Sequence, residues 1–149
     1  QTPLVRAPVA EAIFEILKRT EVQPRYKKAV VVGSGRLVGA PAAKLLRELG
    51  ADVSVITQTH GSLDQLKTAD IVVLGAGEPG LIKPAMLRQG VVLIDAGTSE
   101  QGGKLAGDAD PSCAEVCSVF TPVPGGIGPI AVAMIFKNLF TLVKKNSGR

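Results

Sequence analysis

The sequence predicts a single α/β domain built on a doubly wound parallel sheet. Its 149 residues match the usual size of one domain. Hydrophobic residues make up 46 % of the chain and aromatic residues only 3 %, so Val, Ile, Leu and Ala must form the core. Short β-branched runs alternate with segments of helical spacing, as in parallel strands joined by crossovers. The unbroken apolar runs fit strands that are buried on both faces.

Three segments have apolar residues at helical spacing. The first follows Pro8, whose missing N–H is harmless in the first turn of a helix. The second stops at Gly50, and glycine is common just past the end of a helix. The predicted helices cover residues 9–17, 37–49 and 130–143, and the last of them is expected to be amphipathic.

Short apolar runs bounded by turn residues predict the strands. The first run ends at Gly33 and is therefore expected to enter a tight turn. Right-handed crossovers between successive parallel strands would place helices on both faces of the sheet. The predicted strands cover residues 29–32, 53–56, 71–74 and 91–94, with a fifth short piece at Val119 and Phe120.

Composition and charge argue against two classes of partner. The net charge of +4 is spread along the chain, and few aromatic residues are present for stacking on bases. We therefore expect no nucleic-acid partner. No apolar run reaches the roughly 18 residues of a membrane helix, so we expect no membrane partner either.

Cys113 and Cys117 lie in a segment predicted to be helical, and we expect both to be free, buried thiols. With His60 as the single histidine, they are too few for a metal site. Free thiols and the lack of a visible signal peptide indicate a reducing compartment, the cytoplasm or, as the alternative, mitochondria. The chain starts with Gln1 rather than Met, so we expect a fragment or a processed product.

A glycine-rich turn, Gly33-Ser-Gly-Arg-Leu-Val-Gly39, follows the first predicted strand and precedes the second predicted helix. Its glycines allow the backbone to approach a phosphate, and the helix N-terminus supplies N–H donors and a partial positive charge. This position favours a Rossmann-like dinucleotide site, although the spacing is GxGxxxG rather than GxGxxG. The alternative is a turn that only packs the strand against the helix.

The end of the second predicted strand bears on the choice between NADP and NAD. NAD-binding units normally place Asp or Glu there for the ribose hydroxyls. Here the chain reads Ile56-Thr-Gln-Thr-His60, without a carboxylate. Gln58 could accept a 2′-phosphate without repelling it, which favours NADP and leaves NAD as the alternative. Arg36, within the glycine-rich turn, is the one fixed positive charge expected nearby, and His60 is expected to be an ordinary loop histidine.

Two further turns follow strands at the same sheet edge. Thr121-Pro-Val-Pro-Gly-Gly-Ile-Gly-Pro129 combines X-Pro bonds with glycines in a rigid, irregular path, as in loops that line a ligand crevice. The alternative is a structural corner. In the turn from Ile94 to Thr98, Gly97 would let a ligand approach the backbone, whereas Asp95 in the alternative only caps the turn.

Five strings, in order along the chain, resemble one family. They are VVVGSGRLVGAP, ADIVVLGAGEPG, GVVLIDAGT, GKLAGDAD and TPVPGGIGPIAVAM, of which TPVPGGIGP is the most specific. From about Pro8 onward the chain is similar to the C-terminal, NADP-binding domain of methylenetetrahydrofolate dehydrogenase/methenyltetrahydrofolate cyclohydrolase. In that family a preceding domain, which this chain lacks, carries the catalytic Lys and Tyr and an Asp that contacts folate.

The resemblance implies that this domain holds NADP while the preceding domain holds a tetrahydrofolate derivative, in a homodimeric enzyme. That enzyme would oxidise 5,10-methylenetetrahydrofolate to the methenyl form and hydrolyse it to 10-formyltetrahydrofolate. No residue of this chain would be catalytic, so the chain alone should be inactive. The residues implied at the cofactor are Gly33, Ser34, Gly35, Gln58 and Thr98. The residues implied on the folate side of the cleft are Pro122, Val123, Pro124, Gly125, Gly126, Ile127, Gly128, Pro129 and Ile130.

Several positions depart from the family's pattern. The phosphate turn usually reads Gly-Arg-Ser or Gly-Ala-Ser where this chain has Gly33-Ser34-Gly35, which removes a side-chain donor. Thr57-Gln58 stands where His-Ser is frequent, and Thr98-Ser99 where Ile-Asn is usual. These losses favour an alternative function: a decayed, non-catalytic domain that acts as a structural or interaction module, fused to a formyltetrahydrofolate ligase. The intact TPVPGGIGP string favours the enzyme.

Overall fold

Five parallel strands form the main sheet of the computed structural model, which describes residues 4–148. Their order across the sheet is β2-β1-β3-β4-β7, which confirms the predicted doubly wound α/β fold. The predicted domain, residues 1–149, extends beyond the described residues at both ends. The strands are β1 (Lys28–Val32), β2 (Asp52–Ile56), β3 (Ile71–Leu74), β4 (Val91–Asp95) and β7 (Cys117–Thr121).

The strand order reverses between β1 and β3. The chain passes from β1 to β2 on one side, then crosses back to place β3 on the other side of β1. Val32 pairs with Leu74 at the carboxyl ends of β1 and β3, and the N–H of Gly75 donates to the carbonyl oxygen of Val32 at 2.8 Å. The turns at Gly33 and Gly75 therefore start side by side. In open α/β sheets, ligands bind at this kind of reversal.

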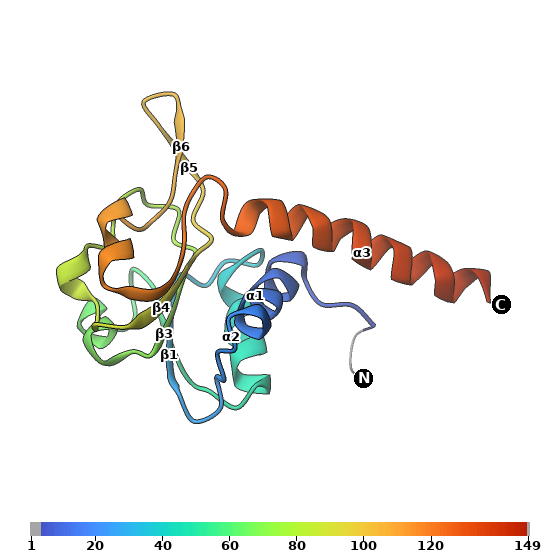
Figure 1. Ribbon diagram of the computed structural model, residues 1–149, viewed down its shortest axis with the longest axis horizontal. Coiled ribbons are helices and arrows are strands. Elements are labelled where there is room, and N and C mark those ends of the chain that lie inside the picture. The colour runs from blue at the N-terminus through green and yellow to red at the C-terminus, as the bar shows by residue number, and fades with distance from the viewer. Residues whose placement is uncertain (1–3, 149) are drawn as a thin grey trace.

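The two faces of the sheet are covered differently. Alternate residues of a strand point to opposite faces. The face that includes Val31 and Val73 packs against α1 (Pro8–Arg19) and α2 (Gly39–Glu48), which lie together on one side of the strands (Figure 1). The face that includes Val30 and Val72 is covered by short 3-10 helices and loops. The 3-10 helices are η1 (Leu63–Thr68), η2 (Pro84–Met86) and η3 (Pro111–Glu115).

The prediction that helices cover both faces was therefore wrong for the second face, because no α-helix among the described residues lies there. The connection from β3 to β4 contains Pro79, Gly80 and Pro84. Proline removes a helical hydrogen bond and glycine adds conformational entropy to the unfolded chain, so an α-helix is disfavoured in this connection.

Other boundaries also differ from the predictions. α2 begins at Gly39 rather than at residue 37, and α3 (Ile127–Ser147) begins before residue 130. The cysteines do not share a helix, because Cys113 lies in η3 whereas Cys117 opens β7 and pairs with Val91. Both thiols are free, as predicted, but only Cys113 is buried, because Cys117 lies in an edge strand of the sheet and is half-buried. A projecting antiparallel hairpin, β5 (Ser99–Gln101) and β6 (Lys104–Ala106), was not predicted (Figure 1).

Most of α3 lies outside the body of the domain (Figure 1). Its first turn is fixed by Ile127, which is buried in the core, and Ile130 and Met134 pack partly against the same core. The rest of the helix leaves large apolar side chains exposed. These exposed residues are Val132, Ile135, Phe136, Leu139, Phe140, Leu142 and Val143.

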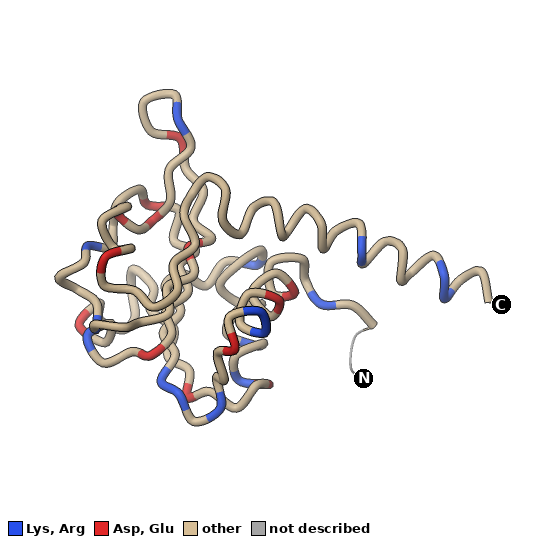
Figure 2. Tube along the Cα trace, in the orientation of Figure 1, with Lys and Arg blue, Asp and Glu red and all other residues tan. Residues whose placement is uncertain are grey.

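Among residues 4–148, α3 is also the one helix long and apolar enough to cross a membrane by length and composition. The mean hydropathy of its most apolar window is 1.5, and 6 % of that window is buried. The expectation that no segment reaches this length was wrong. One such helix is weak evidence for a membrane, and Figure 2 shows basic residues at two places along it.

Candidate functional site

A pocket of about 630 Å³ lies where the strand order reverses. Three segments form its walls: the glycine-rich turn after β1, the loop after β2 and the loop after β3. Its volume lies within the range of roughly 300–1,000 Å³ that is usual for small-molecule sites. The lining residues are Val32, Gly33, Ser34, Gly35, Ile56, Thr57, Gln58, Thr59, Leu63, Gly75, Ala76, Glu78 and Leu81.

The glycine-rich turn needs its first and last glycines for packing. Gly33 has φ +104°, and a Cβ atom there would overlap the backbone of Gly75. A Cβ atom on Gly39 would overlap the carbonyl group of Gly33. These two contacts agree with the alternative of a packing turn, but they do not involve the middle glycine.

Gly35 is the position open to a ligand. A Cβ atom on Gly35 would meet nothing within 4 Å, and its φ lies outside the left-handed region. Within residues 4–148, the N–H groups of Ser34 and Gly35 donate to no other backbone group, so both are available to an anion. α2 begins at Gly39 with no acidic residue in its first turn, so its partial positive charge acts at this end of the pocket. These features fit a bound phosphate group.

The pocket itself lacks a basic side chain among its lining residues. Its single charged lining residue is Glu78, which is exposed. Arg36, the predicted nearby cation, is not part of the lining. Thr57, Gln58 and Thr59 line the pocket. These neutral side chains stand where an NAD-binding unit would place a carboxylate for the ribose hydroxyls. A cofactor here would be held by backbone N–H groups and neutral side chains.

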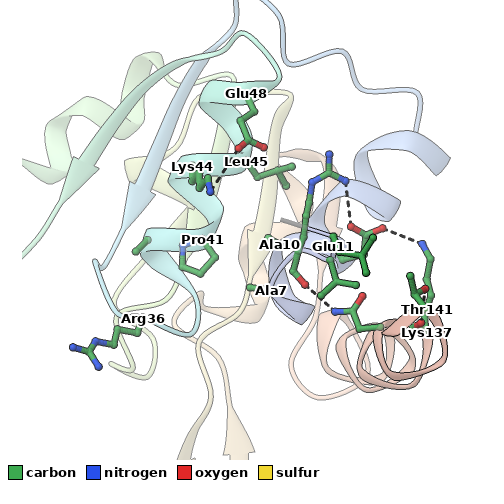
Figure 3. Close-up of a pocket in the computed structure, with 15 residues that line it drawn as sticks. Ala7, Ala10, Glu11, Arg36, Pro41, Lys44, Leu45, Glu48, Lys137 and Thr141 are labelled. Atoms are coloured by element: carbon green, nitrogen blue, oxygen red, sulfur yellow. Dashed lines mark hydrogen bonds and ion pairs between the residues drawn. The ribbon is translucent and has the colours of Figure 1, made fainter. Parts of the chain in front are cut away.

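A second hollow, of about 690 Å³, lies between α1, α2 and α3 (Figure 3). Arg36 lies at its edge, and none of the residues predicted at the cofactor lines it. Glu11 is central to its wall and accepts from Lys137 at 2.9 Å and from Arg6 at 3.2 Å. The amide of Asn138 donates to the carbonyl oxygen of Arg6 at 2.8 Å. These hydrogen bonds join α3 to α1 and to the segment before α1, so the residues around this hollow hold the helices together.

At the end of β4, Asp95 has a structural role. Its buried carboxylate accepts from the N–H groups of Gly97, Asp108 and Ala109 at 2.9, 3.2 and 2.8 Å. Burial raises the pKa of this carboxyl above its ordinary value, although the three hydrogen bonds oppose the shift. This geometry supports the alternative that Asp95 caps the turn. Thr98 is exposed and is not among the residues lining the pocket.

The turn after β7 lies beside the end of β4, because Thr121 pairs with Ile94. The Val123–Pro124 bond is cis, and Gly125 has φ +92°. None of the residues from 122 to 130 lines the pocket of 630 Å³. Ile127 is buried in the core, whereas five others are exposed: Pro122, Pro124, Gly125, Gly128 and Pro129.

The loop after β3 supplies a wall of the pocket that the sequence did not predict. Gly75, Ala76, Glu78 and Leu81 contribute to the lining. The signal that could have identified them is the Gly-Ala-Gly run directly after a buried strand, which resembles the turn after β1.

The described residues contain no group of three or more His, Cys, Asp and Glu residues that could hold a metal ion. Burial raises the pKa of the Cys113 and Cys117 thiols to about 11. Both thiols are therefore neutral near pH 7 and poor nucleophiles.

The fold and this pocket define a dinucleotide-binding α/β domain of the Rossmann type. The chain belongs to the family of the tetrahydrofolate dehydrogenase/cyclohydrolase NAD(P)-binding domain, whose family model matches residues 7–147. The family resemblance seen in the sequence is confirmed.

Relatives and solved structures agree with this assignment. The bifunctional protein FolD of Staphylococcus aureus strain Newman is 37 % identical over 139 residues, which cover 91 % of this chain and 49 % of that protein. The Trypanosoma brucei N5,N10-methylenetetrahydrofolate dehydrogenase-cyclohydrolase, solved with NADP and an inhibitor, is 34 % identical with a TM-score of 0.91. The match covers 99 % of this chain and 53 % of that one.

The bifunctional enzyme FolD of Campylobacter jejuni is 33 % identical with a TM-score of 0.88, over 93 % of this chain and 50 % of that one. This chain thus spans about half the length of the relatives that it matches.

Proposed function

We propose that this chain is the NADP-binding half of an enzyme that oxidises 5,10-methylenetetrahydrofolate to the methenyl form and hydrolyses that product to 10-formyltetrahydrofolate. The observation that carries the proposal is the pocket at the reversal of strand order, in a domain of this family. The Trypanosoma brucei relative was solved with NADP.

The N–H groups of Ser34 and Gly35, with the N-terminus of α2, would bind the cofactor's phosphates. Gln58 would face the ribose carrying the 2′-phosphate, and Thr98 would lie beside the cofactor beyond the pocket. When bound, NADP would supply the acceptor for a hydride from the methylene carbon of the folate. The domain's own contribution is to orient the cofactor and to complete one wall of the cleft. The turn from Pro122 to Ile130 would form the folate side of that wall.

The first experiment measures NADP binding to this chain by calorimetry. Gly35→Asp places a carboxylate at the open position of the phosphate turn, whereas Gly35→Asn adds a neutral side chain of similar size. We expect binding by the parent chain and by Gly35→Asn, and at least about tenfold weaker binding by Gly35→Asp. If the parent chain does not bind NADP, the proposed cofactor role fails. If both variants bind equally, the phosphates do not lie at Gly35.

The catalytic groups would belong to the half that precedes this domain in its relatives. We therefore expect this chain alone to catalyse neither reaction, because residues 122–130 contain no acidic or basic side chain. An assay of NADP-dependent oxidation of methylenetetrahydrofolate tests this. Turnover by this chain near that of an intact relative would contradict the division of labour that we propose.

The exposed apolar surface of α3 supports a missing half. Phe136 and Phe140 are 65 % and 63 % exposed, in a chain that spans about half the length of its relatives. We propose that the other half covers this surface. Hydrogen exchange compared between this chain and the full-length protein should show protection of α3 only in the latter. Equal exchange would point to another occupant, a second copy or a membrane.

The decayed, non-catalytic module is the less well supported alternative, because the relatives are bifunctional enzymes and the pocket is open at Gly35.

We further propose that the full-length protein is a homodimer held through this domain, which sedimentation of the full-length protein would test. The free thiols support a reducing compartment, and we propose the cytoplasm, with mitochondria as the alternative.

A further inference from the structure

The wall of the pocket formed by the loop after β3 is held by a buried carboxylate from a distant part of the chain. Asp108 has no exposed surface. Its Oδ2 accepts from the N–H of Ala76 at 2.7 Å and of Gly77 at 3.3 Å, and its Oδ1 accepts from the N–H of Glu78 at 2.9 Å. Three successive backbone donors of one loop thus converge on a single side chain.

This convergence matters because successive N–H groups in a turn form a concave site for an anion. In this protein the carboxylate of Asp108 occupies that site in place of an external anion. The same loop has a second side-chain partner, because the hydroxyl of Ser99 donates to the carbonyl oxygen of Gly77 at 3.0 Å. The position of the loop in the pocket wall therefore depends on both Asp108 and Ser99.

Asp108 is itself fixed to the end of β4. Its N–H donates to the carboxylate of Asp95 at 3.2 Å, and its carbonyl oxygen accepts from the N–H of Ile82 at 2.9 Å. The carboxylate of Asp108 can lie where it does because residue 97 is a glycine. A Cβ atom on Gly97 would overlap that carboxylate. A continuous path of hydrogen bonds thus leads from the sheet, through Asp108, to the loop that lines the pocket.

We propose that Asp108 is a positioning residue of the nucleotide pocket, which holds residues 76–78 in the conformation that receives the dinucleotide. It touches no ligand in this role, and it acts through the loop. This inference rests on the proposed function, since it assigns a purpose to the wall of the NADP pocket.

The test is Asp108→Asn in this chain. The amide keeps one acceptor oxygen but turns an NH₂ group toward the loop's N–H groups, so part of the loop loses its partner. We expect the variant to fold, the amides of residues 76–78 to exchange faster, and the Kd for NADP to rise by about tenfold or more. The amides of β1 should exchange at their usual rate. The matched control is Asp110→Asn, since that carboxylate bonds Lys83 and Ser112 rather than the loop.

A folded Asp108→Asn variant that binds NADP as tightly as the parent would overturn the inference, as would a loss of binding that matches only the unfolded fraction. Should this variant not fold, Ser99→Ala removes the second side-chain hydrogen bond to the same loop. It should then raise loop exchange and Kd together by a smaller factor, and an unchanged Kd with faster exchange would reject the role. If the parent chain does not bind NADP, the proposed function fails separately, while the exchange of residues 76–78 still shows whether Asp108 holds the loop.

Discussion

The carbonyl group of Gly33 lies so close to Gly39 that a Cβ atom on Gly39 would overlap it. The first and last glycines of the GxGxxxG turn are thus in backbone contact, and this contact sets how closely α2 approaches β1. The middle glycine, Gly35, has open space in front of it. One motif therefore combines two structural glycines with one at which a ligand can approach.

Gly39→Ala is expected to destabilise the domain strongly. The added methyl group meets backbone atoms, which cannot rotate away, so the free energy of unfolding should fall by about 2 to 4 kcal/mol. Gly35→Ala is the matched control, because its methyl group meets nothing within 4 Å and its φ is not left-handed. Urea unfolding of both variants measures the difference. Equal stabilities would show that the turn can widen.

Gly35→Ser is expected to tighten NADP binding. The family's phosphate turn usually carries a serine at this position, and serine adds a hydroxyl donor. Because Gly35 does not have a positive φ, the substitution brings no backbone strain. One added hydrogen bond should lower the Kd by about three- to tenfold. Calorimetry with Gly35→Ala as the control separates the hydroxyl from the added carbon, and an unchanged Kd for the serine variant would contradict the predicted phosphate position.

Glu78→Gln is expected to strengthen binding of NADP more than binding of NAD. Glu78 is the single charged residue lining the pocket, and removing it relieves repulsion of an anionic cofactor. Because Glu78 is exposed, the gain in affinity for NADP should be only a few-fold, roughly, at low salt and should disappear in high salt.

The parent chain should discriminate weakly between NADP and NAD. The neutral side chain of Gln58 gives no reason for a preference for NAD. A preference of the parent chain for NAD of roughly a hundredfold would therefore contradict this prediction.

The strands were predictable from the sequence, whereas much of the second layer was not. Runs such as Ile71 to Leu74 are apolar at every position because both faces are buried, and this pattern is local. Cys117 was misplaced because β-strand pairing with Val91 decided its conformation, and helical spacing could not reveal that partner. α3 begins at Ile127 rather than at the predicted residue 130, because Ile127 packs into the core.

The candidate site divides in the same way. The turn from Gly33 to Gly35 has a local signature and lines the pocket as expected. Asp108 had no such signature, because its partners lie about thirty residues earlier in the chain and meet it only after β3 and β4 have paired. An Asp that follows a glycine, as Asp108 follows Gly107, is indistinguishable from a turn residue until that geometry exists.

The contact between α1 and α3 should depend on pH through Glu11. Burial alone would raise the pKa of Glu11, but hydrogen bonds from Lys137 and Arg6 outweigh it and hold the pKa below its ordinary value of 4.5. A lowered pKa in the folded state means that the stabilisation is present above pH 4.5 and is lost as the pH falls through the folded-state value. Glu11→Gln should therefore cost about 1 kcal/mol near neutral pH and nearly nothing in strong acid.

Urea unfolding at the two pH values measures this difference. Glu15→Gln is the control on the same helix, since Glu15 forms an i,i+4 pair with Arg19 at 3.4 Å and does not reach α3. A Glu11→Gln cost that stays the same in strong acid would show that packing, rather than charge, accounts for the contribution of Glu11.

The two glycines at 125 and 126 should respond differently to alanine, although sequence reasoning treats them alike. A Cβ atom on Gly126 would overlap the carbonyl oxygen of Pro122, within the turn itself, so Gly126→Ala should disturb the fold of the turn and lower Tm. Gly125 has φ +92° and nothing within 4 Å of a Cβ atom. Its alanine variant should lose only about 1 kcal/mol of stability to backbone strain.

A domain with the usual stability of about 5 to 15 kcal/mol survives the Gly125→Ala change. The new methyl group would stand on the exposed side of the turn that we propose for folate, where a displacement of about 1 Å can cost about a hundredfold in rate. We therefore expect kcat/KM of the full-length protein to fall far more than its folded fraction for Gly125→Ala, and in step with its folded fraction for Gly126→Ala. If Gly125→Ala keeps full activity while folded, the turn is a structural corner and the folate lies elsewhere.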